Sequence, residues 1–301
     1  MRIVSLIPSA TEILFAVGAG DSVVGVTFEC DHPPEARSRR VVSNTALPEG
    51  LTPSQIDAEV SARVAAGQDI YRLDKGALAE LDPDMILTQD LCAVCAVNVA
   101  GVGEALDYLG CGAEVVTLDP MTLEEVLASI LQVGEITERA DTAIQVVAGL
   151  RARLAEVATA VAGRPPPRIA VLEWTDPPYS SGHWVPDMVA AAGGTDVAGM
   201  SGEPSHRMRW ADVARLEPDV VVLAPCGFDL DRTLAEIVPL DVSANLLGTP
   251  ARQESRVFAV DANATFSRPG PRVADGVELL AHLLHPEEFP DPGVPWSRIR
   301  L

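Results

Sequence analysis

Two cysteines, Cys92 and Cys95, are separated by two residues, a spacing used both by metal sites and by thiol redox pairs. Another predicted loop carries Cys30 and His32. Because structural zinc sites usually take four Cys or His ligands, these four residues could hold one metal ion if the two loops meet. The spacing alone leaves three interpretations open: thiols that line a ligand cleft, a metal site, and a redox pair or disulfide.

Aromatic residues are scarce in this chain, and many of them lie in segments that follow predicted strands. Only 13 of the 301 residues are Phe, Trp or Tyr. Loops normally carry polar turn residues, so rings in these segments predict a binding cleft, with about a third of them expected to pack onto the protein instead. Six rings lie in such loops: Phe28, Trp174, Tyr179, Trp184, Phe228 and Phe266.

The elements that would position these residues are short apolar runs that alternate with helical patterns. The runs cover residues 3–7, 23–26, 84–88, 114–118, 168–173, 219–224 and 256–260. Near-continuous apolar strands separated by helices are typical of parallel sheets that are covered on both faces. The sequence therefore predicts an α/β fold with Rossmann-like parallel sheets, in which ligands bind beyond the carboxyl ends of the strands.

The segment from residue 121 to residue 163 has apolar residues at helical spacing. It begins at a capping box made by Thr122 and Glu125, and the three prolines at 165–167 end it. A single helix of about 40 residues would be about 60 Å long, although Gly134 could allow a break or bend. We therefore expect an N-terminal α/β lobe at 1–120, a long rigid connecting helix at 121–163 and a C-terminal α/β lobe at 164–301.

Two pairs of short segments in the two halves resemble each other. Residues 81–87, LDPDMIL, match residues 216–222, LEPDVVV, and each copy leads into a predicted strand. Residues 29–34, ECDHPP, and residues 174–178, WTDPP, both place an Asp and a Pro-Pro pair after a strand end. Together these repeats favour two lobes of similar construction.

The composition excludes several classes of partner. With 22 basic and 43 acidic residues the formal net charge is −21, so nothing supplies a basic surface for nucleic acid, and anionic lipid headgroups would be repelled. No segment has the ~18 uninterrupted apolar residues of a membrane span, and the apolar run at the N-terminus is too short for an export signal. We expect a cytoplasmic protein as the sequence stands, or a periplasmic or other extracytoplasmic one if translation starts upstream.

Motifs of the common enzyme classes are absent. The chain has no G-x-S-x-G, no P-loop, no H-E-x-x-H and no G-x-G-x-x-G after the first predicted strand. We therefore expect a non-catalytic protein. An enzyme that acts on a metal complex through the C-x-x-C loop is an alternative.

The order and spacing of several segments resemble the substrate-binding proteins of cobalamin and iron-siderophore ABC importers, and the cobalamin-binding type most closely. The segments are RIVSLIPSATEILFAVGAGDSVVGVT (2–27), ECDHPP (29–34), LAELDPDMILTQ (78–89), DPPYSSG (176–182), MRWADVARLEPDVVVLAP (208–225) and ATFSRPGPR (264–272), together with the predicted helix between the halves. The resemblance covers about residues 2–284.

The resemblance implies two lobes joined by the helix, a corrinoid (cobalamin-like) or related metal chelate in the cleft between them, and an ABC permease as partner. The family's cleft positions correspond to Phe28, Tyr179 and Phe266, whose rings would contact the flat macrocycle. Acidic residues dock such proteins on the permease, and Glu80 and Glu203 are candidates. By position in the same loops we add, as further ligand contacts, Cys30, Asp31, Cys92, Cys95, Trp174, His183, Trp184 and Arg268. A metal-ion-binding protein that uses Cys30, His32, Cys92 and Cys95 is the alternative interpretation.

Overall fold

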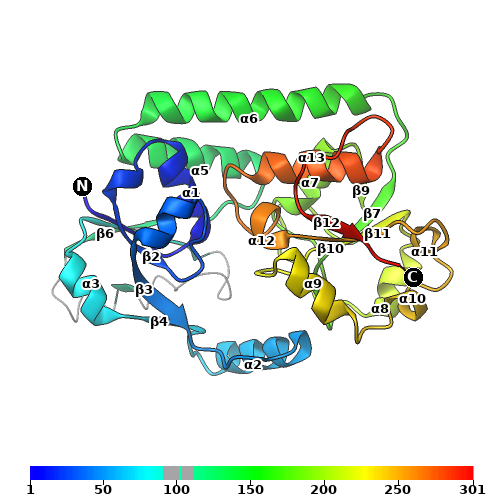
Figure 1. The fold of residues 1–301 in the computed structure, drawn as a ribbon, viewed down its shortest axis with the longest axis horizontal. Coiled ribbons are helices and arrows are strands. Elements are labelled where there is room, and N and C mark those ends of the chain that lie inside the picture. The colour runs from blue at the N-terminus through cyan, green and yellow to red at the C-terminus, as the bar shows by residue number, and fades with distance from the viewer. Residues whose placement is uncertain (91–101, 104–111, 301) are drawn as a thin grey trace. The chain divides into compact units, whose positions relative to one another are not determined.

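Two separate sheets, one in each unit of the structure, organise the chain. The computed structural model describes residues 1–90, 102–103 and 112–300. The first unit comprises residues 1–51, 55–120 and 127–148, and the second comprises residues 52–54, 121–126 and 149–301. In Figure 1 the strands of the first unit are blue to cyan, and those of the second run from green to red.

In the described residues, the sheet of the first unit has the strand order β4-β3-β2-β1-β5-β6. Neighbouring strands are parallel, except that β4 is antiparallel to β3. The elements are β1 (Ile3–Ser5), α1 (Pro8–Ala16), η1 (Gly20–Ser22), β2 (Val23–Thr27), η2 (Pro34–Ser38), β3 (Arg40–Thr45), α2 (Pro53–Ala65), β4 (Tyr71–Leu73), α3 (Lys75–Leu81), β5 (Met85–Thr88) and β6 (Glu114–Thr117).

Helix α3 packs on one face of this sheet. Its Leu78 is fully buried in a cluster that includes Val4 of β1 and Ile86 of β5. Gly25 of β2 lies under the same helix, and a Cβ atom at this position would be 2.7 Å from Leu81 Cδ1. A residue without a side chain is therefore needed for α3 to approach the sheet this closely.

The sheet of the second unit has the order β12-β11-β10-β7-β8 in the described residues, and β9 also pairs with β7. Strands β9, β7, β10 and β11 run parallel to one another, whereas β8 is antiparallel to β7 and β12 is antiparallel to β11. The elements are β7 (Arg168–Thr175), β8 (Pro178–Ser180), α7 (Val185–Ala191), β9 (Thr195–Asp196), α8 (Trp210–Arg215), β10 (Val220–Leu223), α9 (Leu230–Ile237), α10 (Val242–Asn245), α11 (Pro250–Gln253), β11 (Val257–Val260), α12 (Ala262–Thr265), α13 (Val273–Leu284) and β12 (Trp296–Arg298).

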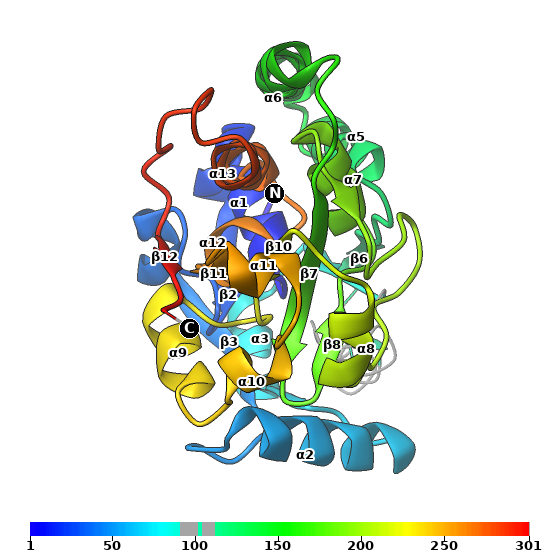
Figure 2. The ribbon, with the colours of Figure 1, turned by 90° about the vertical axis from the view of Figure 1, so that its right-hand side faces the viewer.

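Helices cover both faces of the second sheet, as can be followed in Figure 2. On one face, Val213 of α8 and Ile237 of α9 belong to a buried cluster with side chains of β7, β10 and β11. On the other face, α7 and α13 contact each other, and Leu284 of α13 and Ile169 of β7 both border the space beside Gly194. This arrangement matches the predicted α/β class with helices on both sides.

Each unit repeats one set of hydrogen bonds at the amino end of its two central strands. In the first unit, the N–H of Arg2 donates to Asp84 Oδ2 (2.6 Å), and the N–H of Asp84 donates to the carbonyl oxygen of Arg2 (2.9 Å). The Arg2 side chain completes the set, because its Nε donates to the carbonyl oxygen of Leu81 (2.8 Å). We call these contacts the strand clamp.

The strand clamp of the second unit is built from the repeated L-x-P-D segment. The N–H of Arg168 donates to Asp219 Oδ2 (2.8 Å), and the N–H of Asp219 donates back to the Arg168 carbonyl oxygen (2.8 Å). Arg168 Nη2 donates to the carbonyl oxygen of Leu216 (2.7 Å). Asp82 and Glu217 occupy the same position in the two copies, and both have a left-handed φ, 41° and 46°. The predicted similarity of the two lobes is confirmed at this level of detail.

All seven predicted strands are present, as β1, β2, β5, β6, β7, β10 and β11. The structure adds β3, which is internal and parallel to β2, the short parallel strand β9, and the antiparallel edge strands β4, β8 and β12. The antiparallel edge strands have three residues each and mix polar with apolar residues, as in YRL of β4 and PYS of β8. Edge strands are exposed to water, so they do not need the continuous apolar run that marks a central strand.

The segment between the halves contains two helices rather than the single helix expected. Helix α5 (Leu123–Ile136) begins at the predicted capping box, where the N–H of Glu125 donates to Thr122 Oγ1 (3.3 Å). It ends before Glu138, which has a φ of 58°, and α6 (Ala140–Val161) follows. A Cβ atom on Gly134 would lie 2.3 Å from Ala143 Cβ, so the glycine lets α6 pack directly against α5. The second helix has 22 residues and is about 33 Å long.

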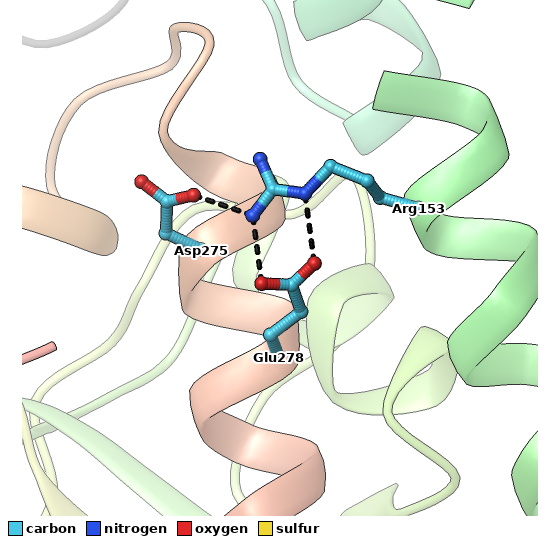
Figure 3. A network of polar contacts seen from close by, with 3 residues as sticks. All are labelled: Arg153, Asp275 and Glu278. Atoms are coloured by element: carbon cyan, nitrogen blue, oxygen red, sulfur yellow. Dashed lines mark hydrogen bonds and ion pairs between the residues drawn. The ribbon is translucent and has the colours of Figure 1, made fainter. Parts of the chain in front are cut away.

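Helix α6 is tied to α13 within the second unit by one arginine. Arg153 Nε and Nη2 each donate to a carboxylate oxygen of Glu278 (2.7 Å), and Nη2 also donates to Asp275 Oδ1 (2.6 Å), as Figure 3 shows. The hydrogen bonds to Glu278 raise the pKa of the guanidinium, so the arginine stays charged.

Among the described helices, none is long and apolar enough to cross a bilayer.

We expect Arg153→Met to lower the free energy of unfolding by about 1–2 kcal/mol, because a two-point contact to Glu278 and the bond to Asp275 are lost from a partly buried site. The matched control is Arg151→Met on the same helix, which removes only the more exposed pair with Glu124. It should cost less than about 0.5 kcal/mol. Urea unfolding of the three proteins measures both effects, and equal losses would contradict the assignment.

Candidate functional site

Among the described residues, the carboxyl edge of the first sheet carries hydroxyl groups and the thiol of Cys30. Cys30, which follows β2, is 3% exposed, and its Sγ lies 3.0 Å from Thr11 Oγ1 of α1. The Thr11 hydroxyl in turn donates to Ser5 Oγ at the end of β1 (2.9 Å). These contacts place the thiol inside the unit, whereas Asp31 is partly exposed and His32 is exposed.

The metal hypothesis also needs Cys92 and Cys95, which lie outside the described residues. In the part of the chain that is described, no three His, Cys, Asp or Glu side chains are grouped closely enough to hold a metal ion. Cys30 and Cys226 are thiols. The four-ligand metal site therefore stays a prediction, as do the ligand contacts expected for Cys92 and Cys95.

An aromatic pair lies at the same edge of the first sheet. Phe28 follows β2 directly and is 39% exposed, and its ring centroid is 6.3 Å from that of Tyr71. Tyr71 begins β4 opposite Thr45, the last residue of β3, so both rings stand where parallel strands end. The Tyr71 hydroxyl donates to Glu29 Oε2 (3.3 Å). The sequence predicted Phe28 but missed Tyr71, because the three-residue strand that carries it there has no pattern of its own.

The second unit carries aromatic side chains in line across its sheet edge. Trp174, near the end of β7, stands opposite Tyr179 of β8, and Tyr179 stands opposite Arg207 of a later segment. Residues directly opposite each other in antiparallel pairing project to the same face of a sheet. Trp174, Tyr179 and Arg207 therefore align on one face, and we call them the cross-strand row.

A buried ring supports the cross-strand row. Phe228, in the loop after β10, meets Trp174 edge-on with ring centroids 5.1 Å apart. Phe228 is only 2% exposed, and the guanidinium of Arg232 lies over its ring, 3.8 Å from the centroid. Trp174 and Tyr179 remain partly exposed. The accessible part of this edge thus includes the two rings and the guanidinium of the cross-strand row, which are held by paired backbone segments and by a ring beneath them.

Other predicted contacts of the second unit form a packed group. Trp184 is 6% exposed, and its indole N–H donates to the carbonyl oxygen of Phe266 (2.9 Å). Phe266 is 1% exposed and Arg268 is 5% exposed. The ring of His183, which has a φ of 53°, lies 5.7 Å from that of Trp184. Three of the six loop aromatics, Trp184, Phe228 and Phe266, are buried, so more of them support the loops than the third expected.

Burial shifts the protonation of two groups in these loops. The pKa of Asp261, whose Oδ1 accepts a hydrogen bond from the N–H of Ala264 (2.8 Å), is raised because burial disfavours the carboxylate. The pKa of His183 is lowered for the same reason, since burial disfavours the imidazolium. Burial therefore favours the uncharged imidazole of His183, the form that accepts hydrogen bonds and binds metals.

The lowered pKa of His183 predicts a pH dependence of stability. The folded state binds this proton less readily than the unfolded chain does. The neutral His183 therefore contributes to the free energy of unfolding above pH 6.5, and this contribution is lost as the pH falls below 6.5. The urea midpoint should fall between about pH 7.5 and about pH 5.5, and it should fall less in His183→Asn, since Asn tolerates the positive φ. Identical pH profiles for the two proteins would contradict this role of His183.

Comparison with known proteins places these features in context. The family described as "Periplasmic binding protein" matches residues 3–264. A cobalamin-binding protein of Halobacterium salinarum is 27% identical over 290 residues, which cover 94% of this chain and 69% of the relative. A vitamin B12-binding protein of Vibrio cholerae is 26% identical over 286 residues, which cover 94% of this chain and 88% of the relative.

Solved structures give the same answer for the fold. A periplasmic heme-binding protein of Pseudomonas aeruginosa superposes with a TM-score of 0.74 at 20% identity, covering 100% of this chain and 99% of that one. The periplasmic vitamin B12-binding protein BtuF of Vibrio cholerae gives a TM-score of 0.68 at 22% identity, covering 94% and 96% of the two chains. These relatives are named as binding proteins and not as enzymes, in agreement with the expectation of a non-catalytic protein. Because the family match spans most of the sequence, the chain belongs to the periplasmic binding protein family and is a substrate-binding protein of the ABC-importer type.

Proposed function

We propose that this protein binds a corrinoid, with cobalamin as the test case, or a related tetrapyrrole metal chelate. The observation that carries the proposal is the cross-strand row, in which Trp174 and Tyr179 are aligned by the pairing of β7 with β8. Both rings keep exposed surface while Phe228 fills the space behind Trp174. A rigid aromatic surface of this kind suits a large, flat and mostly apolar ligand.

The names of the relatives support the same ligand class. The curated relatives from Halobacterium salinarum and Vibrio cholerae are named for cobalamin or vitamin B12, and several structures of the same fold are named for heme. Corrinoids and hemes are both planar metal chelates with a polar rim. Arg207 ends the cross-strand row, and a guanidinium can donate hydrogen bonds to amide or carboxylate groups of such a rim.

In the first unit, Phe28 and Tyr71 offer a second aromatic surface for the same kind of ligand. Phe28 keeps exposed surface, and Tyr71 is held by its hydrogen bond to Glu29. We also keep Asp31 and His183 as proposed ligand contacts, because neither side chain is fully buried. Cys30, Trp184, Phe266 and Arg268 are buried, and for these we propose that they support the loops that carry the contacts.

We further propose that the protein delivers its ligand to an ABC permease. Glu80 and Glu203, the two candidate docking residues, are exposed. This role suits a protein that works outside the cytoplasmic membrane, the second of the two compartments expected from the sequence. Co-purification with a candidate ABC permease, lost on Glu80→Lys or Glu203→Lys, would test the partner.

Titration calorimetry with cobalamin, cobinamide and hemin tests the ligand class. We expect one of these ligands to bind with a Kd well below ~100 μM and to quench tryptophan fluorescence, because Trp174 would lie against an absorbing macrocycle. No binding below ~100 μM by any corrinoid or heme would contradict the proposal.

Variants of the cross-strand row test the site itself. Trp174→Ala and Tyr179→Ala should each raise the Kd by about 10–100-fold, since each removes an aromatic contact worth about 1.4–2.8 kcal/mol. Phe28→Ala should weaken binding by about 10-fold for the same reason. The control is Trp296→Phe in β12, where the ring packs on Phe258 and His282 instead. Equal effects of the control and the row variants would mean that the losses are structural.

A further inference from the structure

We propose that Asp196 is the positioning residue of the cross-strand row, acting through the segment that places Arg207 beside Tyr179. The inference rests on the proposed function for its ligand, but its structural part can be tested without one. Asp196 ends β9, the two-residue strand that pairs with the start of β7. No sequence motif singled it out.

Asp196 ties two chain segments together through its two carboxylate oxygens. Oδ1 accepts hydrogen bonds from the N–H groups of Ala198 and Gly199 (2.9 Å each), which turns the chain directly after β9. Oδ2 accepts a hydrogen bond from Ser181 Oγ (2.5 Å), one residue after the end of β8. One side chain therefore joins β8 to the segment that begins at residue 197.

The close approach at this point leaves no room for a larger residue. A Cβ atom on Gly199 would lie 2.1 Å from Ser181 Oγ and 2.4 Å from the Ser181 carbonyl oxygen. A Cβ atom on Gly182 would lie 2.3 Å from the backbone nitrogen of Ser205. Both glycines let the segment after β9 lie directly on the segment after β8, which agrees with a fixed rather than a loose arrangement.

From this anchor the two segments pair as far as the row. His183 N–H donates to the Glu203 carbonyl oxygen (2.7 Å), and Ser180 N–H donates to the His206 carbonyl oxygen (2.9 Å). The hydroxyl of Ser180 also lies 2.9 Å from His206 Nδ1. The next pair along this ladder is Tyr179 with Arg207, the outer part of the cross-strand row.

The strand pairing along this stretch is short. Strand β8 has three residues, and residues 203–208 form no named strand of their own. Burial raises the pKa of Asp196, while its hydrogen bonds from Ser181, Gly199 and Ala198 oppose that shift. A carboxyl group held at this position despite the cost of burying it fits a residue that anchors the ladder.

The test compares Asp196→Ala with Asp196→Asn. Alanine removes all three hydrogen bonds, so we expect the Kd for cobalamin or hemin, whichever the wild type binds, to rise about 10-fold or more. Asparagine keeps an oxygen for the Ala198 and Gly199 N–H groups and can donate to Ser181 Oγ, so it should stay within about 3-fold of wild type. Asp241→Ala is the control, because it removes a comparable bond to a backbone N–H at α10 of the same unit and should leave the Kd unchanged.

A double-mutant cycle separates positioning from general destabilisation. If Asp196 acts by placing Tyr179 and Arg207, Asp196→Ala should weaken binding in the wild-type background and have little further effect in the Tyr179→Ala background. Full additivity of the two variants, or wild-type affinity in Asp196→Ala, would overturn the proposal.

Hydrogen exchange gives a readout that needs no ligand. Backbone amides of residues 198–199, 203 and 205–208 should exchange faster in Asp196→Ala than in wild type or Asp241→Ala. Unchanged exchange in these residues overturns the proposal even if no tested ligand binds, whereas absence of binding with faster exchange refutes only the proposed function. Should Asp196→Ala fail to fold, Ser181→Ala removes the same link from the other side and is measured in its place.

Discussion

The strand clamp is the contact on which the rest of each unit depends. Loops that leave parallel strands lie together at one edge of the sheet only if the strands are paired in the correct register. In each unit an arginine uses its backbone and its side chain to hold the residues that lead into the neighbouring central strand. The hydrogen bonds determine where both strands begin, and therefore which residues emerge at their carboxyl ends.

In the second unit, the register of β7 and β10 sets where the cross-strand row begins. Strand β7 has eight residues and β10 has four, and their ladder runs from Ile169 and Val220 to Leu172 and Leu223. The last residues of β7 extend beyond that ladder and pair with β8 instead. Trp174 stands on this extension, so its position depends on a hairpin edge rather than on the parallel core.

Aromatic residues in these loops have two different tasks. Phe228 and Phe266 are enclosed by protein and hold loops in place, whereas Phe28 and Tyr179 present surface. Relatives of similar fold are named for different planar ligands at low sequence identity. A scaffold whose loops are held by buried rings can change its exposed rings without losing its structure, which is a physical basis for such variation.

The sequence by itself determined the α/β class, seven of the strands, the capping box and the repeated L-x-P-D segments, because each of these depends on neighbouring residues or on continuous apolar burial. It also singled out the loops in which the ligand contacts are proposed. It predicted one connecting helix where there are two, because the contact between Gly134 and α6 involves residues nine positions apart in a folded-back chain. Tyr71 and Asp196 became candidates only through tertiary structure, as did the pairing of Arg207 with Tyr179. Their neighbours come from short edge strands and from segments distant in sequence, and pairing of that kind leaves no periodic pattern in the amino-acid sequence.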